Sequence, residues 1–148
     1  MAFMRFMALS LALALSFVGA DKDKKPKLSL KASPSMGMSP VRVVASADLN
    51  GGANDYEDFY CPSIEWDWGD DTKSTSSGDC DPYEAGKSEI KRRFTADHVY
   101  RIGGDFRIQF RMKKQNKAIA AVSTTVKIGE GIGGSDRPPR ATESSRRP

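Results

Sequence analysis

The 148-residue chain is poor in the residues from which catalytic and metal sites are usually built. It has one histidine, His98, and two cysteines, Cys61 and Cys80. No Gly-x-Ser-x-Gly or His-Glu-x-x-His motif is present, so no nucleophile, base and orienting acid can be assembled around His98. No Cys-x-x-Cys spacing supports a zinc site. We expect His98 to be hydrogen bonded near a turn, and the protein not to be an enzyme; a hydrolase is the weaker alternative.

Long apolar runs are also scarce. Residues 7–18 are almost wholly apolar, Arg5 precedes them and Val18-Gly19-Ala20 follows, which is typical of a secretory signal peptide over residues 1–20. The run is short of the roughly 20 residues that span a bilayer, so an uncleaved anchor is the less favoured interpretation. We expect a secreted protein, extracellular or periplasmic, with no transmembrane segment.

No stretch has the periodicity of an amphipathic helix, whereas an apolar period of two recurs. Phe106, Ile108, Phe110 and Met112 alternate with polar residues and form the clearest predicted strand. Similar strands are predicted within residues 28–32, 41–49, 64–68 and 122–128, and a weaker one over 88–94. The fold should therefore be all-β.

The two ends of the mature chain differ in composition from the middle. Residues 21–26 are mostly Asp and Lys, and residues 130–148 are rich in Gly, Pro, Ser and Arg. Both are expected to be disordered. Residues 27–129 then form one domain, large enough for a modest core.

Two short motifs in this domain resemble the signature of a known family. Trp66-Asp67-Trp68-Gly69-Asp70 and His98-Val99-Tyr100, followed by Gly104 and Phe106, resemble the signature of the polycystic kidney disease (PKD) domain family. That signature is close to Trp-Asp-Phe-Gly-Asp-Gly and then His-x-Tyr-x-x-x-Gly-x-Tyr. The resemblance implies an immunoglobulin-like β-sandwich of about seven strands, in a family of usually non-catalytic extracellular modules.

The motif residues have structural roles to play in such a sandwich. Trp66 and Trp68 lie on one face of their strand and are expected to fill the space between the sheets. Gly69 permits a tight turn, in which the Asp70 carboxylate can accept backbone N–H groups. Asp71 stands where the family usually has Gly, so we expect a somewhat different turn. Tyr100 should be a corner tyrosine with its hydroxyl on a backbone group.

The chain has an even number of cysteines, Cys61 and Cys80, and is expected to be exported, which predicts a disulfide between them. The bridge would tie the entry of the Trp66 strand to the Ser-rich loop after it. Free thiols or metal-binding thiols are the competing interpretation.

Acidic and amide side chains gather before and after the Trp66 strand. The candidates for a calcium site are Asp48, Asn50, Asp55, Asp58, Asp70 and Asp71. Calcium prefers six to eight oxygen ligands, and such side chains could supply them. A solvated polar loop with Gly51-Gly52 as a turn is the alternative, and no other cofactor is expected.

Basic residues also lie on one side of the clearest strand: Arg107, Arg111 and Lys113. If this strand pairs with the Trp66 strand, Glu65 and Asp67 face these cations as cross-strand pairs. Because we expect export, we expect no nucleic-acid partner; weak attraction to an anionic polysaccharide or to the cell envelope is the alternative for these cations. We expect a monomeric binding module for an extracellular protein or polysaccharide. The alternative is a structural or auxiliary cell-envelope protein without a specific ligand.

Overall fold

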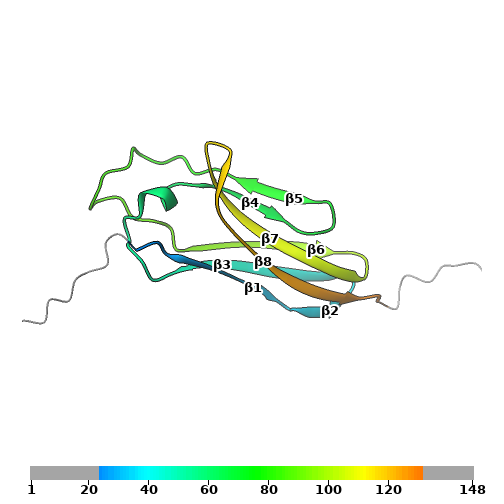
Figure 1. The fold of residues 1–148 in the computed structure, drawn as a ribbon. Helices are drawn as coiled ribbons and strands as arrows, with labels where there is room; N and C mark the ends of the chain where they lie inside the picture. The colour runs from blue at the N-terminus through cyan, green and yellow to red at the C-terminus, as the bar shows by residue number, and fades with distance from the viewer. Residues whose placement is uncertain (1–23, 132–148) are drawn as a thin grey trace, which may run out of the picture.

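The computed structural model describes residues 24–131, which form two packed β-sheets (Figure 1). The predicted signal peptide and nearly all of the predicted C-terminal tail lie outside these residues. The strands are β1 (Lys27–Ser33), β2 (Met36–Met38), β3 (Val41–Asn50), β4 (Ser63–Asp67), β5 (Lys73–Ser76), β6 (Arg93–Tyr100), β7 (Gly104–Lys114) and β8 (Lys117–Gly129), with a 3₁₀ turn η1 (Glu57–Phe59). No helix within residues 24–131 is long and apolar enough to cross a membrane.

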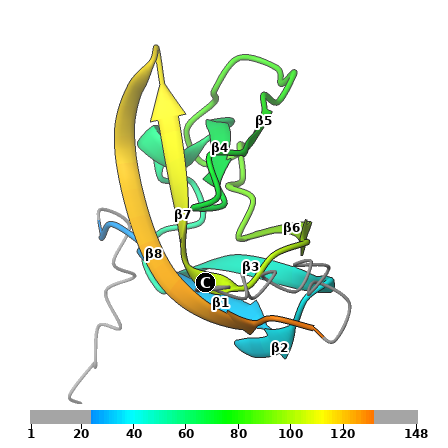
Figure 2. The same cartoon turned by 90° about the vertical axis from the view of Figure 1, so that its right-hand side faces the viewer.

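One sheet has three strands in the order β1-β3-β6, and the other has five in the order β2-β8-β7-β4-β5. All pairings are antiparallel except that of β2 with β8. Figure 2 shows the long strand β8 on one side of the molecule and the edge strands β5 and β6 on the other. The predicted all-β sandwich is confirmed.

The core lies between the sheets because alternate side chains of the central strands point inward. On β7, the predicted apolar face is buried, with Ile108, Phe110 and Met112 fully inaccessible to solvent. On β3, Val43, Ala45 and Ala47 are equally buried, and their small side chains leave room for the large aromatic residues of the facing sheet.

Three strands differ from the sequence prediction. The strand predicted over residues 88–94 is wrong in position, because β6 runs from Arg93 to Tyr100. The loop expected after the Trp66 strand contains β5, and β2 was not predicted. The Ser33–Pro34 and Ser39–Pro40 peptide bonds on either side of β2 are cis.

The β7–β8 hairpin aligns the two longest strands. Gln115 and Asn116 form its two-residue turn, both with positive φ, at 48° and 63°. This is the backbone that matches the right-handed twist of a hairpin. The turn places the polar row of β7 beside that of β8 on the outside of the five-stranded sheet.

Candidate binding surface

Trp66 and Trp68 anchor the core under the surface described below. Their exposed fractions are 4% and 1%, and their rings stack with centroids 5.8 Å apart. Trp66 also packs against Phe110 at 4.6 Å. Burying two such side chains contributes several kcal/mol at about 25 cal/mol per Å², so the two tryptophans make β4 a rigid support for its outward-facing residues.

Tyr100 and His98 of β6 form hydrogen bonds with the segment that follows β4, and so join the two sheets. The Tyr100 hydroxyl donates a hydrogen bond to the Trp68 carbonyl oxygen at 2.7 Å, which is the kind of backbone contact expected of this residue. His98 stacks on the Trp68 ring at 4.9 Å, and its Nε2 lies 2.6 Å from Asp70 Oδ2. Burial, and secondarily the Asp70 charge, raise the pKa of Tyr100. The histidine is thus held by a carboxylate and an aromatic ring in a structural contact.

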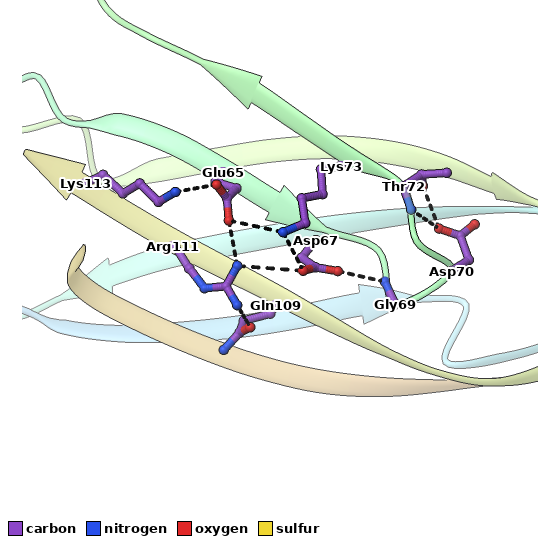
Figure 3. Close-up of polar contacts among 9 residues, drawn as sticks. All are labelled: Glu65, Asp67, Gly69, Asp70, Thr72, Lys73, Gln109, Arg111 and Lys113. Atoms are coloured by element: carbon purple, nitrogen blue, oxygen red, sulfur yellow. Dashed lines mark hydrogen bonds and ion pairs between the residues drawn. The ribbon is translucent and has the colours of Figure 1, made fainter. Parts of the chain in front are cut away.

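The β4–β5 turn follows from Gly69 and Asp70. Gly69 has φ of 79°, and a Cβ there would lie 2.7 Å from the Arg107 carbonyl oxygen. Asp70 Oδ1 accepts hydrogen bonds from the backbone N–H of Thr72 at 3.2 Å and from its hydroxyl at 2.5 Å (Figure 3). Asp71 itself adopts the left-handed conformation, with φ of 64°. Asp71 therefore has the left-handed backbone conformation that a glycine would adopt more easily at this position.

Burial acts to raise the pKa of Asp70, but hydrogen bonds from Thr72 and His98 outweigh it, so the pKa lies below its ordinary value. The carboxylate is therefore stabilised in its charged form.

The second motif continues this aromatic cluster. Phe106 stacks on Tyr100 with ring centroids 4.4 Å apart. Gly104 lies so close to the Phe106 ring that a Cβ would be 2.9 Å from its Cζ. The glycine thus lets the chain pass over the ring as β7 begins.

The Cys61–Cys80 disulfide predicted from the sequence is confirmed, with the two Cα atoms 6.2 Å apart. Cys61 precedes β4, and Cys80 lies in the connection between β5 and β6. The bridge therefore closes the end of the β4–β5 hairpin that is opposite its turn.

A network of ion pairs covers the outside of β4, β5 and β7. Glu65 Oε1 lies 2.6 Å from Arg111 Nη1, and Lys113 donates to the other oxygen of Glu65. Asp67 Oδ2 lies 3.4 Å from Lys73 Nζ and 3.7 Å from Arg111 Nη1 (Figure 3). The hydrogen bonds from Lys113 and Arg111 hold the pKa of Glu65 below its ordinary value. The predicted cross-strand pairs are present, and they neutralise part of the predicted basic row.

Arg107 lies on the same face but has a different environment. It is exposed, and its Nε and Nη2 atoms donate to the Ser123 hydroxyl at 3.1 and 2.9 Å. We call this side of the five-stranded sheet the charged outer face. Its cations are Lys73, Arg107, Arg111, Lys113 and Lys127, and its carboxylates are Glu65, Asp67 and Asp105. The face therefore has more positive than negative side chains.

Lys73 was not singled out in the sequence. Lys73 could have been identified only from the β4–β5 hairpin, because pairing these strands around the Gly69 turn places Lys73 directly opposite Asp67. A strand of exposed polar residues gives no hydrophobic pattern from which this pairing could be read.

The acidic residues considered for calcium are spread over several elements. Asp48 pairs with Arg93 at 2.6 Å, and the Asn50 amide donates to the Ser29 hydroxyl at 2.9 Å. Asp55 Oδ2 accepts the Gly86 N–H at 3.2 Å, and Asp58 lies in η1.

Asp70 and Asp71 lie at the β4–β5 turn, where Asp70 contacts His98. His98 is opposite Val43 in the β3–β6 pairing, and Asp48 lies five positions further along β3. The Asp70–His98 contact is therefore at a different part of this strand from Asp48. Residues 24–131 contain no group of three or more His, Cys, Asp or Glu side chains that could hold a metal ion.

Two packed sheets with this strand order define an immunoglobulin-like β-sandwich. Among solved structures, the chain is similar to the PKD domain of an M14-like peptidase from Thermoplasmatales archaeon SCGC AB-540-F20. The TM-score is 0.49 and the identity 10%, over 72% of this chain and 97% of that chain. No protein-family model matches the chain. No curated protein matches it either.

Proposed function

We propose that this chain is a secreted, non-catalytic binding module whose charged outer face attaches to an anionic polysaccharide outside the cell. The observation that carries the proposal is Arg107, an exposed guanidinium on a face on which cations outnumber carboxylates. The disulfide supports an oxidising location, because such bridges form and persist outside the cytosol.

The geometry of the face suits a long polymer better than a small ligand. Its polar side chains project from adjacent strands of one sheet, so their charges extend across a broad surface. Arg111 and Lys113 are held by Glu65, with side-chain exposed fractions of 26% and 29%. Arg107 and Lys127 are exposed. Within the face, the cations best placed to reach a ligand are therefore Arg107, Lys127 and Lys73, whose side chain is 54% exposed. The ion pairs of Arg111 and Lys113 mainly fix the surface around them.

The test is retention of the purified protein on immobilised heparin and immobilised polygalacturonate over a salt gradient. Arg107→Ser should elute at lower salt than the wild type on at least one of them, because it removes a contacting charge. Retention should weaken as salt rises, since charges on the surface are screened over about 8 Å at physiological ionic strength.

Arg42→Ser is the matched control. It removes the same charge from the outside of the other sheet, where Arg42 pairs with Asp97 at 3.2 Å. If the two variants elute together, only net charge matters and the assigned face is wrong. If the wild type is not retained at low salt, the alternative of a structural envelope protein without a ligand takes the place of this proposal.

A further inference from the structure

The short edge strand β2 presents two methionine side chains on one face. Its residues are Met36, Gly37 and Met38, and alternate residues of a strand point to the same side. A Cβ on Gly37 would lie 3.1 Å from Cγ2 of Val41, whose side chain packs against the core. The side of Gly37 therefore faces the protein interior, and Met36 and Met38 both project from the outside of the five-stranded sheet.

Pairing with β8 shows where the Met38 sulfur lies. β2 runs parallel to β8, with Met36 opposite Lys127 and Met38 opposite Gly129. A Cβ on Gly129 would lie 2.6 Å from Met38 Sδ, so the glycine leaves the space in which this sulfur lies. Met38 is thus placed against the outer surface of β8, and Met36 lies two residues earlier on the same face.

The two thioethers are open to solvent, with exposed fractions of 70% for Met36 and 58% for Met38. The third methionine within residues 24–131, Met112, has no exposed surface. The two cysteine sulfurs of the same residues are joined in the disulfide. Within the described part of the chain, the sulfur atoms that a metal ion can reach and bind are therefore those of Met36 and Met38.

Strand geometry lets the two sulfurs contact one ion. Cα atoms of alternate strand residues lie about 6.6–6.8 Å apart, and each methionine side chain has three rotatable bonds. Both side chains are largely exposed, so they can turn toward a common ion without disturbing the core. A thioether is a soft donor that favours ions such as copper(I), whereas calcium and magnesium require oxygen ligands.

We propose that Met36 and Met38 form a binding site for a soft monovalent metal ion, copper(I) or silver(I), with one thioether sulfur from each residue. Lys127 lies beside Met36, but its side chain is exposed and can hold its charge in water away from the ion. The site does not rest on the proposed function, because Arg107 takes no part in it.

A thioether carries no proton that a metal ion must displace. Affinity for the ion should therefore be nearly constant between about pH 5 and 8. A site that uses a histidine ligand behaves differently, because protons compete with the metal for the ring nitrogen over this range. The pH dependence thus separates the methionine pair from a site at His98.

The experiment is to label the methionine methyl groups of the purified protein and to record their carbon–proton correlation spectra while silver nitrate is added in a chloride-free buffer. The signals of Met36 and Met38, each assigned by its loss in a Leu variant, should shift together and saturate at one silver ion. The Met112 signal should not move. Calcium should shift none of the three, because it requires oxygen ligands.

Met36→Leu and Met38→Leu keep an apolar side chain of similar volume but remove one sulfur. Even residues behind the ligands change metal affinity by about 10- to 100-fold, so each variant should weaken silver binding at least about tenfold. Arg107→Ser should bind silver as the wild type does, so this proposal and the proposed function can fail separately.

Four results would overturn the proposal. The first is that neither methyl signal shifts. The second is that each single variant leaves the silver affinity of the remaining methionine unchanged, because the two sulfurs would then bind separately. The third is that silver binds as tightly to the double Leu variant as to wild type, and the fourth is an affinity that falls steeply in acid, which would point to His98.

Discussion

The hydroxyl of Tyr100 on β6 donates a hydrogen bond to the backbone carbonyl of Trp68, 2.7 Å away at the end of β4. Tyr100 ends β6 of the three-stranded sheet, whereas Trp68 directly follows β4 of the five-stranded sheet. Tyr100 is 1% exposed. The bond therefore satisfies a carbonyl that water does not easily reach, and it joins the sheets beside the His98–Asp70 contact.

Tyr100→Phe should destabilise the protein by about 1–3 kcal/mol, because the Trp68 carbonyl loses its partner inside the protein. Urea unfolding measures this change. Tyr60→Phe is the matched control, since the Tyr60 hydroxyl donates to the Asp81 carbonyl at 3.0 Å in an exposed position. Water can replace that bond, so equal losses in the two variants would contradict a special role for Tyr100.

The strands that the sequence predicted well are those whose alternation is complete. β3 and β7 each place apolar residues at every second position, because one face packs on the other sheet. The predicted position of β6 was wrong because two of its inward-facing residues, Ala96 and His98, are not large apolar residues, so the apolar pattern does not mark them. The inward positions of β5 are serines at the open side of the sandwich, so no apolar period marks it.

The candidate surface was predicted in part. Glu65 and Asp67 could be placed opposite the basic row once β4 was assumed to pair with β7. The difference between Arg111 and Arg107 could not be read from spacing. Arg111 is opposite Glu65, whereas Arg107 lies beyond the paired length of β4 and reaches Ser123 on β8. β2 also left no signal, since it has three residues between two prolines and pairs with a strand distant in sequence.

The Cys61–Cys80 bridge should be complete in the secreted protein, which is expected to show no free thiol until it is reduced. Replacing both cysteines by Ser should cost roughly 3 kcal/mol, since the bridge limits the unfolded chain over a loop of about 18 residues. Thiol titration and urea unfolding test the two statements. Two reactive thiols in the native secreted protein would contradict the first.

Acid should weaken the contact between the sheets at Asp70. The pKa of this carboxyl is below its ordinary value of 3.8 in the folded protein, so the unfolded chain binds a proton more readily. The stability that Asp70 contributes is therefore present above about pH 4 and is lost as pH falls through the lower, folded pKa. In urea unfolding over a pH series, Asp70→Asn should be less stable than wild type near neutral pH, and the gap should narrow in acid.

Asp71→Asn removes the neighbouring carboxylate, which is exposed, and is the charge-matched control for that series. A gap between wild type and Asp70→Asn that stays constant from neutral pH to below pH 4 would show that the Asp70 charge contributes nothing.

Gly69 and Asp71 both have positive φ in the β4–β5 turn, but substitution should affect stability much more at Gly69 than at Asp71. Gly69→Ala should cost more than about 2 kcal/mol, because a left-handed backbone already costs about 1–2 kcal/mol for a side chain and its Cβ would lie 2.7 Å from the Arg107 carbonyl oxygen. Asp71→Gly relieves the strain of the left-handed backbone, but it also raises the conformational entropy of the unfolded chain. The two effects oppose each other, so the stability of this variant should remain within about 1 kcal/mol of wild type.

Gly86→Ala separates these effects, since Gly86 has φ of 75° and a Cβ there would meet nothing within 4 Å. It should cost only the conformational part, about 1–2 kcal/mol. Thermal unfolding of the three variants gives the order: Gly69→Ala least stable, then Gly86→Ala, then Asp71→Gly. If Gly69→Ala loses no more stability than Gly86→Ala, the close approach of Gly69 to the β7 backbone is not what fixes this turn.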